Sequence, residues 1–184
     1  MRILLLCGST RPGSSNLFVL QAVHELGYPG LRTDLYEALR ALPAFVPDEQ
    51  PLPAPVRDLL SRIDKAEAVL FCTPEYAGGL PGSLKNLLDW TVGGGELYGK
   101  PVAWLDVANP GRGAGARTQL ATVLGYVGAR VVHDACAHVT VERTERADCI
   151  APTSRTALIQ AVETLRDATE RERQPDSARR PPHA

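Results

Sequence analysis

The sequence of 184 residues has few cysteines and no long apolar run, and each absence excludes a class of protein. Its four cysteines, Cys7, Cys72, Cys136 and Cys149, form no Cys-x-x-Cys pair and no metal-ligand spacing. Two of them lie in strand-like apolar runs, so unpaired thiols in a reducing cytoplasm are expected. No apolar stretch approaches the ~20 residues that span a bilayer, so no membrane partner is expected. The apolar block at the start is also too short for a signal peptide.

Charge of one sign is absent as well. The 20 basic residues nearly balance the 21 acidic ones, which leaves a formal net charge of −1. No nucleic-acid partner held by a general positive field is therefore expected. The 44% of apolar and 22% of charged residues are close to globular averages. We expect one domain over residues 1–173, and a disordered tail over the polar stretch 174–184.

Short apolar runs alternate with segments of helical period, a pattern typical of a parallel α/β sheet. Continuously apolar runs predict strands that are buried on both faces, and two weaker runs complete the set. The five strands are expected at residues 3–7, 32–36, 68–72, 102–105 and about 129–132. The helices are expected around residues 19–26, 56–63, 82–91, 120–127 and 158–165. Right-handed crossovers then make a doubly wound sheet of three layers. Residues 43–55 hold five prolines and predict an irregular loop.

The loop after the first strand, residues 8–16, is rich in groups that bind anions. It offers four hydroxyls, an amide, two glycines and the guanidinium of Arg11, directly before a helix. Ligands of such sheets bind beyond the carboxyl ends of the strands, and the start of a helix favours an anion. One serine, Ser14 or Ser15, would be explained by capping the helix. The full set, with an arginine for charge-assisted bonds, favours a phosphate site.

Several phosphate motifs are absent from this loop. It has neither a Gly-x-Gly-x-x-Gly dinucleotide pattern nor the Gly-Lys-Ser/Thr of a P-loop. A cysteine phosphatase would need an arginine six residues after Cys7, where Gly13 stands instead. The dinucleotide and P-loop motifs are therefore excluded, and a cysteine phosphatase is not expected.

The loop after the third strand, residues 73–81, is turn-rich and carries Tyr76 beside two glycines. Such a loop can lay its backbone along a flat ring. Taken singly, Tyr76 is better explained as a half-buried packing residue and Glu75 as a solvated loop charge. Trp90, on the following helix, is expected to pack, and Lys85 and Asp89 are spaced as a helix-surface ion pair.

The two loops together resemble the NADPH-dependent FMN reductase family of flavodoxin-like proteins, which also includes quinone, azo-dye and chromate reductases. The family pattern Gly-Ser-x-Arg-x-x-Ser-x-Asn is complete here as Gly8, Ser9, Arg11, Ser14 and Asn16. The second pattern, Pro-Glu-Tyr-Asn, Pro-Gly-x-Leu-Lys-Asn and Asp-Trp, stands at residues 74–77, 81–86 and 89–90. Its asparagine is replaced by Ala77. The resemblance extends over residues 2–139.

The resemblance implies a flavodoxin-like α/β/α sandwich with five parallel strands in the order 2-1-3-4-5. It implies non-covalent FMN and an enzyme that passes hydride from NADPH or NADH through FMN to a small-molecule electron acceptor. Flavins, quinones, azo compounds and metal ions are acceptors of this kind. No catalytic side chain and no bound metal are expected, because the cofactor carries the chemistry. A homodimer or homotetramer is implied as well.

The resemblance also assigns site residues. The phosphate would be held by the first loop and the ring bordered by the later ones, and Ala77 would lack a polar contact that asparagine makes near the ring. The cofactor-binding residues implied are Ser9, Arg11, Ser14, Ser15, Asn16, Leu17, Pro74, Glu75, Tyr76, Ala77, Gly78 and Asn109. Arg112 or Arg117 would meet the phosphates of NADPH, unless each is only a solvated loop residue. The alternative functions are a flavodoxin-like electron carrier and a flavin-binding regulator without turnover.

Overall fold

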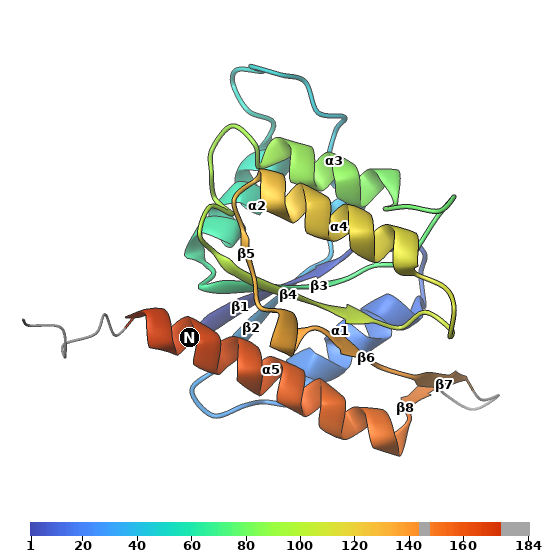
Figure 1. The fold of residues 1–184 in the computed structure, drawn as a ribbon. Helices are drawn as coiled ribbons and strands as arrows, with labels where there is room; N and C mark the ends of the chain where they lie inside the picture. The colour runs from blue at the N-terminus through green and yellow to red at the C-terminus, as the bar shows by residue number, and fades with distance from the viewer. Residues whose placement is uncertain (144–147, 174–184) are drawn as a thin grey trace, which may run out of the picture.

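The computed structural model describes residues 1–143 and 148–173, so the tail expected at 174–184 lies outside the described residues. A parallel sheet lies between two layers of helices (Figure 1). Its strands are β1 (Arg2–Cys7), β2 (Arg32–Tyr36), β3 (Ala68–Cys72), β4 (Pro101–Asp106), β5 (Arg130–Val131) and β6 (Ala137–His138). The helices are α1 (Ser15–Glu25), α2 (Ala54–Lys65), α3 (Gly82–Trp90), α4 (Ala114–Tyr126) and α5 (Pro152–Arg173). Within the two described ranges no helix is long and apolar enough to cross a membrane.

The strand order β2-β1-β3-β4-β5 is the flavodoxin-like order expected from the sequence, and all of these pairings are parallel. Cys7 at the end of β1 pairs with Cys72 of β3, and Cys72 pairs with Leu105 of β4. The carboxyl ends of the three central strands are therefore level. The winding reverses between β1 and β3, so the loops after these strands flank the place where such folds bind ligands.

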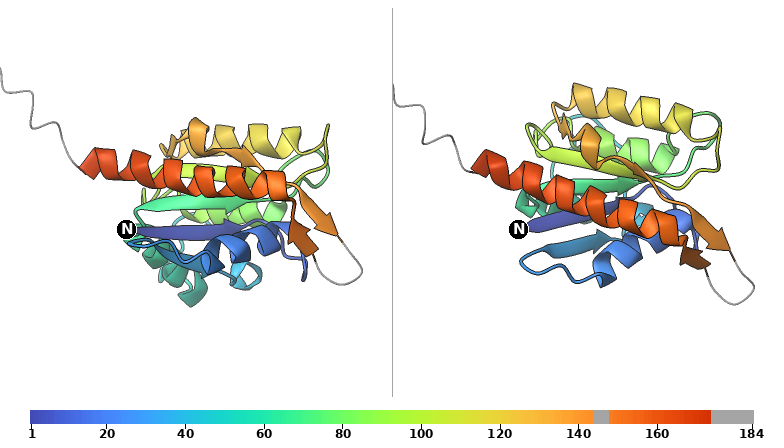
Figure 2. Two further views of the ribbon diagram at one scale, coloured as in Figure 1. Left: turned by 90° about the horizontal axis from the view of Figure 1, so that it is seen from below. Right: turned by 60° about the horizontal axis from the view of Figure 1, so that its bottom comes forward.

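Successive strand residues point to opposite faces, which divides the core into two clusters. Ile3, Leu5 and Leu70 face α1 and α5, whereas Leu4, Leu6 and Phe71 face α2, α3 and α4. Figure 2 shows α5 running across the first of these faces. All six of these side chains are fully buried. Each leucine-sized side chain removed from water contributes about 1.5–3 kcal/mol, and the two clusters together fix the level strand ends.

The helix surface pair expected on α3 is confirmed, since Lys85 Nζ lies 2.6 Å from a carboxylate oxygen of Asp89. The proline-rich loop is confirmed up to Pro53. Pro55 instead lies in the first turn of α2, where a helix does not need its missing N–H.

The fifth strand is interrupted, which the sequence did not predict. A 3-10 turn over His133–Ala135 separates β5 from β6, and both short strands pair with β4. The N–H of Ala135 donates to Val132 O at 2.9 Å, so a local turn bond replaces the ladder there. The turn also buries Ala135 completely. An antiparallel pair, β7 (Val141–Arg143) and β8 (Asp148–Ile150), follows and was likewise not predicted.

Candidate functional site

Three loops lie at the carboxyl edge of the sheet, after β1, β3 and β4, at the right of Figure 1. They span residues 8–14, 73–81 and 107–113. The first two are in close contact at the switch point, because a side chain at Gly8 would place its Cβ only 2.6 Å from Cβ of Thr73. Only glycine fits this approach. The sequence-predicted residues therefore share one edge of the sheet.

The first loop leads into α1 through a side-chain cap. Ser14 is buried and its Oγ accepts a hydrogen bond of 3.1 Å from the N–H of Leu17. Ser9 Oγ accepts from the N–H of Arg11 at 3.3 Å, which curls the loop in front of the helix. The capping role considered for Ser14 is thus present. This cap is compatible with an anion site, because the other N–H groups in the first turn of a helix have no intrahelical partners.

Arg11 supplies the free positive charge of this loop. Its side chain is exposed, and it makes no ion pair within residues 1–143 and 148–173. A hollow of about 180 Å³ lies beside it, lined by Ser9, Arg11, Leu17, Tyr36 and Arg40 among others. Arg40 was not found from the sequence. It belongs to a 3-10 turn after β2, Leu39–Ala41, and no motif connects that turn with the first loop.

Asn16 faces inward from the first turn of α1. It is 6% exposed, and its Oδ1 accepts a hydrogen bond of 3.4 Å from Sγ of Cys72. Burial raises the pKa of both Cys72 and the neighbouring Cys7, so both thiols stay protonated at neutral pH. The side chain of Asn16 therefore links the first loop to β3. Ser15 and Leu17, on either side of Asn16, are half-buried.

The second loop contains a tight two-residue turn. Tyr76 and Gly79 exchange two backbone hydrogen bonds of 3.0 Å, with Ala77 and Gly78 between them. The φ angles of these central residues are 50° and 78°, the pattern of a type I′ turn. Tyr76, Ala77 and Gly78 are exposed, and Pro74 is half-buried before them. The turn presents backbone and an aromatic ring to the shared edge.

Glu75 is bound to α4 rather than free in solvent. Its Oε2 accepts a hydrogen bond of 3.1 Å from the N–H of Ala116, in the first turn of that helix. A carboxylate there satisfies an otherwise unpaired N–H and complements the helix dipole. Further along α4, Gln119 Oε1 accepts from the N–H of Leu80 at 2.8 Å. The sequence contained no signal for Gln119.

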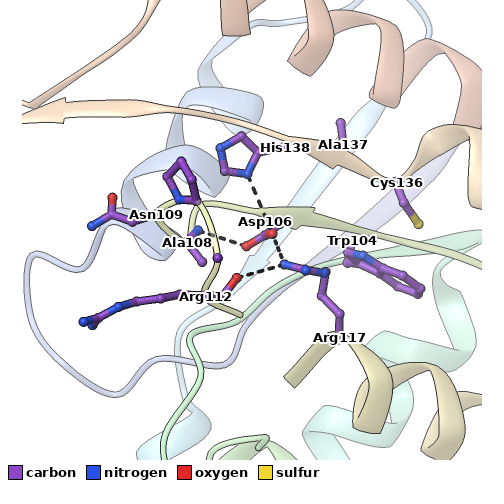
Figure 3. A pocket seen from close by; sticks show the side chains of 11 residues that line it. Trp104, Asp106, Ala108, Asn109, Arg112, Arg117, Cys136, Ala137 and His138 are labelled. Carbon is purple, nitrogen blue, oxygen red and sulfur yellow. Dashed lines mark hydrogen bonds and ion pairs between the residues drawn. The ribbon is translucent and has the colours of Figure 1, made fainter. Parts of the chain in front are cut away.

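The third loop borders a cavity of about 460 Å³ (Figure 3). Asp106 accepts a bond of 2.9 Å from the N–H of Ala108, forms an ion pair with Arg117 and lies 3.7 Å from Nδ1 of His138. Asn109 and Arg112 are exposed at the rim, and the side chain of Arg112 extends away from this cluster. Of the two arginines considered for NADPH, Arg117 is therefore engaged within the chain.

Comparison with known proteins agrees with this geometry. The model of the NADPH-dependent FMN reductase family matches residues 1–142. A quinone reductase of Escherichia coli is 31% identical over 140 residues, which cover 72% of this chain and 74% of that one. An NAD(P)H-dependent FMN reductase of Pseudomonas aeruginosa is 37% identical over 123 residues, 65% of each chain.

A solved structure extends the likeness to the whole fold. A flavoenzyme NAD(P)H:acceptor oxidoreductase from Paracoccus denitrificans superimposes with a TM-score of 0.77 at 26% identity, over 92% of this chain and 97% of that one. With its two motif loops at the carboxyl edge of a flavodoxin-like sheet, the chain belongs to the NADPH-dependent FMN reductase family.

Proposed function

We propose that the chain is an FMN-dependent oxidoreductase that passes hydride from NADPH or NADH to a small acceptor such as a flavin, quinone, azo compound or metal ion. The observation that carries this proposal is the position of its two motif loops. The anion loop and the Tyr76–Gly79 turn follow β1 and β3, whose ends are level on either side of the switch point. Such a pair of loops suits a ligand that carries both a phosphate and a flat ring.

The residues at this edge fit FMN. The phosphate would lie before α1, held by Ser9, Arg11, Ser14 or Ser15 and the backbone N–H of Asn16, since the N–H of Leu17 is already bound to Ser14. Arg11 has its guanidinium available there, and charge-assisted bonds to phosphate are strong. Asn16 would act through its backbone, because its side-chain oxygen is bound to Cys72.

The ring would be bordered by residues 74–78 on one side and by the loop of Asn109 on the other. Within the described part of the chain, the N–H groups of Ala77 and Gly78 are not used by other residues, so they are available to acceptor atoms at a ring edge. Flavin supplies the two-electron chemistry when bound, and the chain supplies binding and orientation. No side chain at this edge is needed as an acid or base.

Steady-state oxidation of NADPH and NADH against a panel of acceptors tests the activity. We expect the FMN-loaded protein to be bleached by at least one nicotinamide and reoxidised by at least one acceptor. A yellow protein that neither nicotinamide bleaches would overturn the proposal and leave a flavin-binding regulator. Bleaching with reoxidation only by another electron-transfer protein would instead indicate a carrier.

We further propose that residues 1–173 form one FMN-binding domain that assembles as a homodimer or homotetramer in the cytoplasm. The support for assembly is a group of exposed apolar side chains, Phe45, Val46 and Val92, around a hollow of about 510 Å³. Trp90 packs inside the chain as expected: its ring lies 5.0 Å from that of Phe45, edge to face.

The support for a reducing compartment is that all four cysteines are free thiols.

A further inference from the structure

One side of α4 carries two small or polar positions that touch the Tyr76–Gly79 turn. Gly115 and Gln119 are four residues apart, so they lie one above the other on the same face of the helix. Gln119 accepts from the N–H of Leu80, directly after the turn, and Glu75, directly before it, accepts from Ala116. The turn is thus held at both of its ends by one helix.

Gly115 is required by the closeness of this contact. A methyl group at position 115 would overlap the carbonyl oxygen of Gly78 and lie 2.8 Å from the carbonyl carbon. Backbone atoms cannot rotate away as the end of a side chain can. Alanine is favoured over glycine in helices, so helix propensity does not explain the glycine at position 115. The turn is equally close to Gln119, because a Cβ at Gly79 would lie only 2.8 Å from Cδ of Gln119.

We infer that Gly115 and Gln119 are positioning residues for the flavin ring, an inference that rests on the proposed function. α4 begins directly after loop 107–113, which forms one wall of the ring site, and its first turns hold the Tyr76–Gly79 turn of the other wall. The face of α4 therefore sets the spacing between the two walls. Neither residue needs to touch the flavin, because each acts through the backbone of the turn.

The test compares Gly115→Ala with Gly125→Ala. Both substitutions remove a glycine from α4, but a Cβ at Gly125 meets nothing within 4 Å. We expect Gly115→Ala to weaken FMN and riboflavin by the same factor, about tenfold or more, the scale on which lost hydrogen bonds act. It should also change the midpoint potential of the bound flavin. Gly125→Ala should bind both flavins within about twofold of wild type, at the same potential.

Gln119 provides a second pair of variants should Gly115→Ala fail to fold. Gln119→Leu removes the acceptor for the Leu80 N–H, whereas Gln119→Glu keeps one. We expect Gln119→Leu to weaken both flavins alike and to shift the potential, and Gln119→Glu to restore most of the affinity.

The outcomes separate the inference from the function it rests on. Wild-type protein that binds FMN while Gly115→Ala matches Gly125→Ala, or while Gln119→Leu matches wild type, would overturn the inference alone. Loss of FMN affinity without loss of riboflavin affinity would also overturn it, because the effect would then act at the phosphate. Wild-type protein that binds neither flavin would overturn the proposed function and this inference with it.

Discussion

Ala77 departs from its family at a position where the backbone itself explains the usual asparagine. Its φ of 50° is left-handed, a conformation that asparagine tolerates and alanine disfavours by about 1–2 kcal/mol. It is the first central residue of a type I′ turn, whose preferred sequence is Asn-Gly, and Gly78 follows. A missing contact to the flavin, the interpretation made from the sequence, is not required to explain the family pattern.

Ala77→Asn should therefore stabilise the flavin-free protein, by about 1 kcal/mol in urea unfolding, because it relieves the left-handed strain. Ala77→Gly relieves the same strain without adding a donor and is the matched control. We expect both variants to share one flavin midpoint potential. A rise of about 30 mV in Ala77→Asn alone, corresponding to ~1.4 kcal/mol for two electrons, would show that the asparagine side chain bonds the reduced ring after all.

Arg11 carries a free positive charge in the first loop, so its removal should lower the affinity for FMN but not the affinity for riboflavin. Arg11→Ala should weaken FMN by about 1.5–3 kcal/mol, the range for a hydrogen bond to a charged group. Riboflavin, which has no phosphate, should bind wild type and variant equally. Titration of both ligands by flavin fluorescence makes the measurement. Equal losses for both ligands would show that Arg11 acts on the ring or on the fold.

Tyr36 should make the folding stability of the protein decrease at alkaline pH. Burial, with a smaller effect of Asp58, raises the pKa of Tyr36 to about 12, and its hydroxyl has no partner within the described residues. The unfolded chain loses this proton near pH ~10, so the folded state then binds more protons. Stability that is fully present below pH ~10 is therefore lost as the pH rises toward ~12.

Tyr36→Phe removes this titration and one unpaired buried hydroxyl. We expect urea unfolding of the variant to show equal or higher stability at neutral pH and a weaker decline above pH ~10 than wild type. Parallel declines in the two proteins would place the alkaline sensitivity elsewhere.

Among the elements, those with strong local patterns were predictable and those defined by tertiary contacts were not. The runs ending at Cys7 and Cys72 are apolar throughout because both faces are covered, and period and flanking turns identify strands of this kind. β5 lies within the strand expected at about 129–132, whereas β6 was not expected, because its two residues are too few for a period to show and its pairing depends on β4.

The same division holds within the candidate site. Ser9 and Arg11 belong to a contiguous motif and were found from it, whereas Arg40 and Gln119 come from elements far away in sequence. Gln119 reaches the turn only because α4 packs beside it, and an isolated glutamine on a helix carries no pattern. The role of Glu75 was hidden for the same reason, since its partner Ala116 is 41 residues further along the chain.

The start of α1 depends on one side chain. Ser14→Ala leaves the N–H of Leu17 without its capping oxygen and should destabilise the flavin-free protein by about 1 kcal/mol. Ser83→Ala is the control, because Ser83 also lies in a first helical turn but α3 has no side-chain cap. Urea unfolding should show a loss for the first variant and a change within about 0.5 kcal/mol for the second. Equal changes would show that the cap bond adds nothing to stability.

At the scale of the whole molecule, the proposed flavin site and the exposed apolar group lie at opposite ends of α3. α3 begins after the ring-bordering loop and ends at Trp90, next to Phe45 and Val92. A second chain seated on this group would therefore pack against the helix that leaves the flavin loop. Apolar residues gathered in this way on a small protein mark contact surfaces.

Assembly through this surface predicts that one charge will separate the chains. Val92 is 63% exposed beside Phe45 and Val46, and an arginine there would place a long charged side chain between the two chains. Burying that charge is costly even though acidic residues line the same hollow. Light scattering at micromolar concentration should give at least twice the chain mass for wild type and the mass of a single chain for Val92→Arg. Tyr126→Arg is the matched control, since Tyr126 is 89% exposed at the end of α4 and away from this hollow, so it should keep the wild-type mass. Both variants should retain the fold, because neither residue belongs to the buried core. A single-chain mass for wild type would contradict the assembly itself, and a multimeric Val92→Arg would move the interface to another surface.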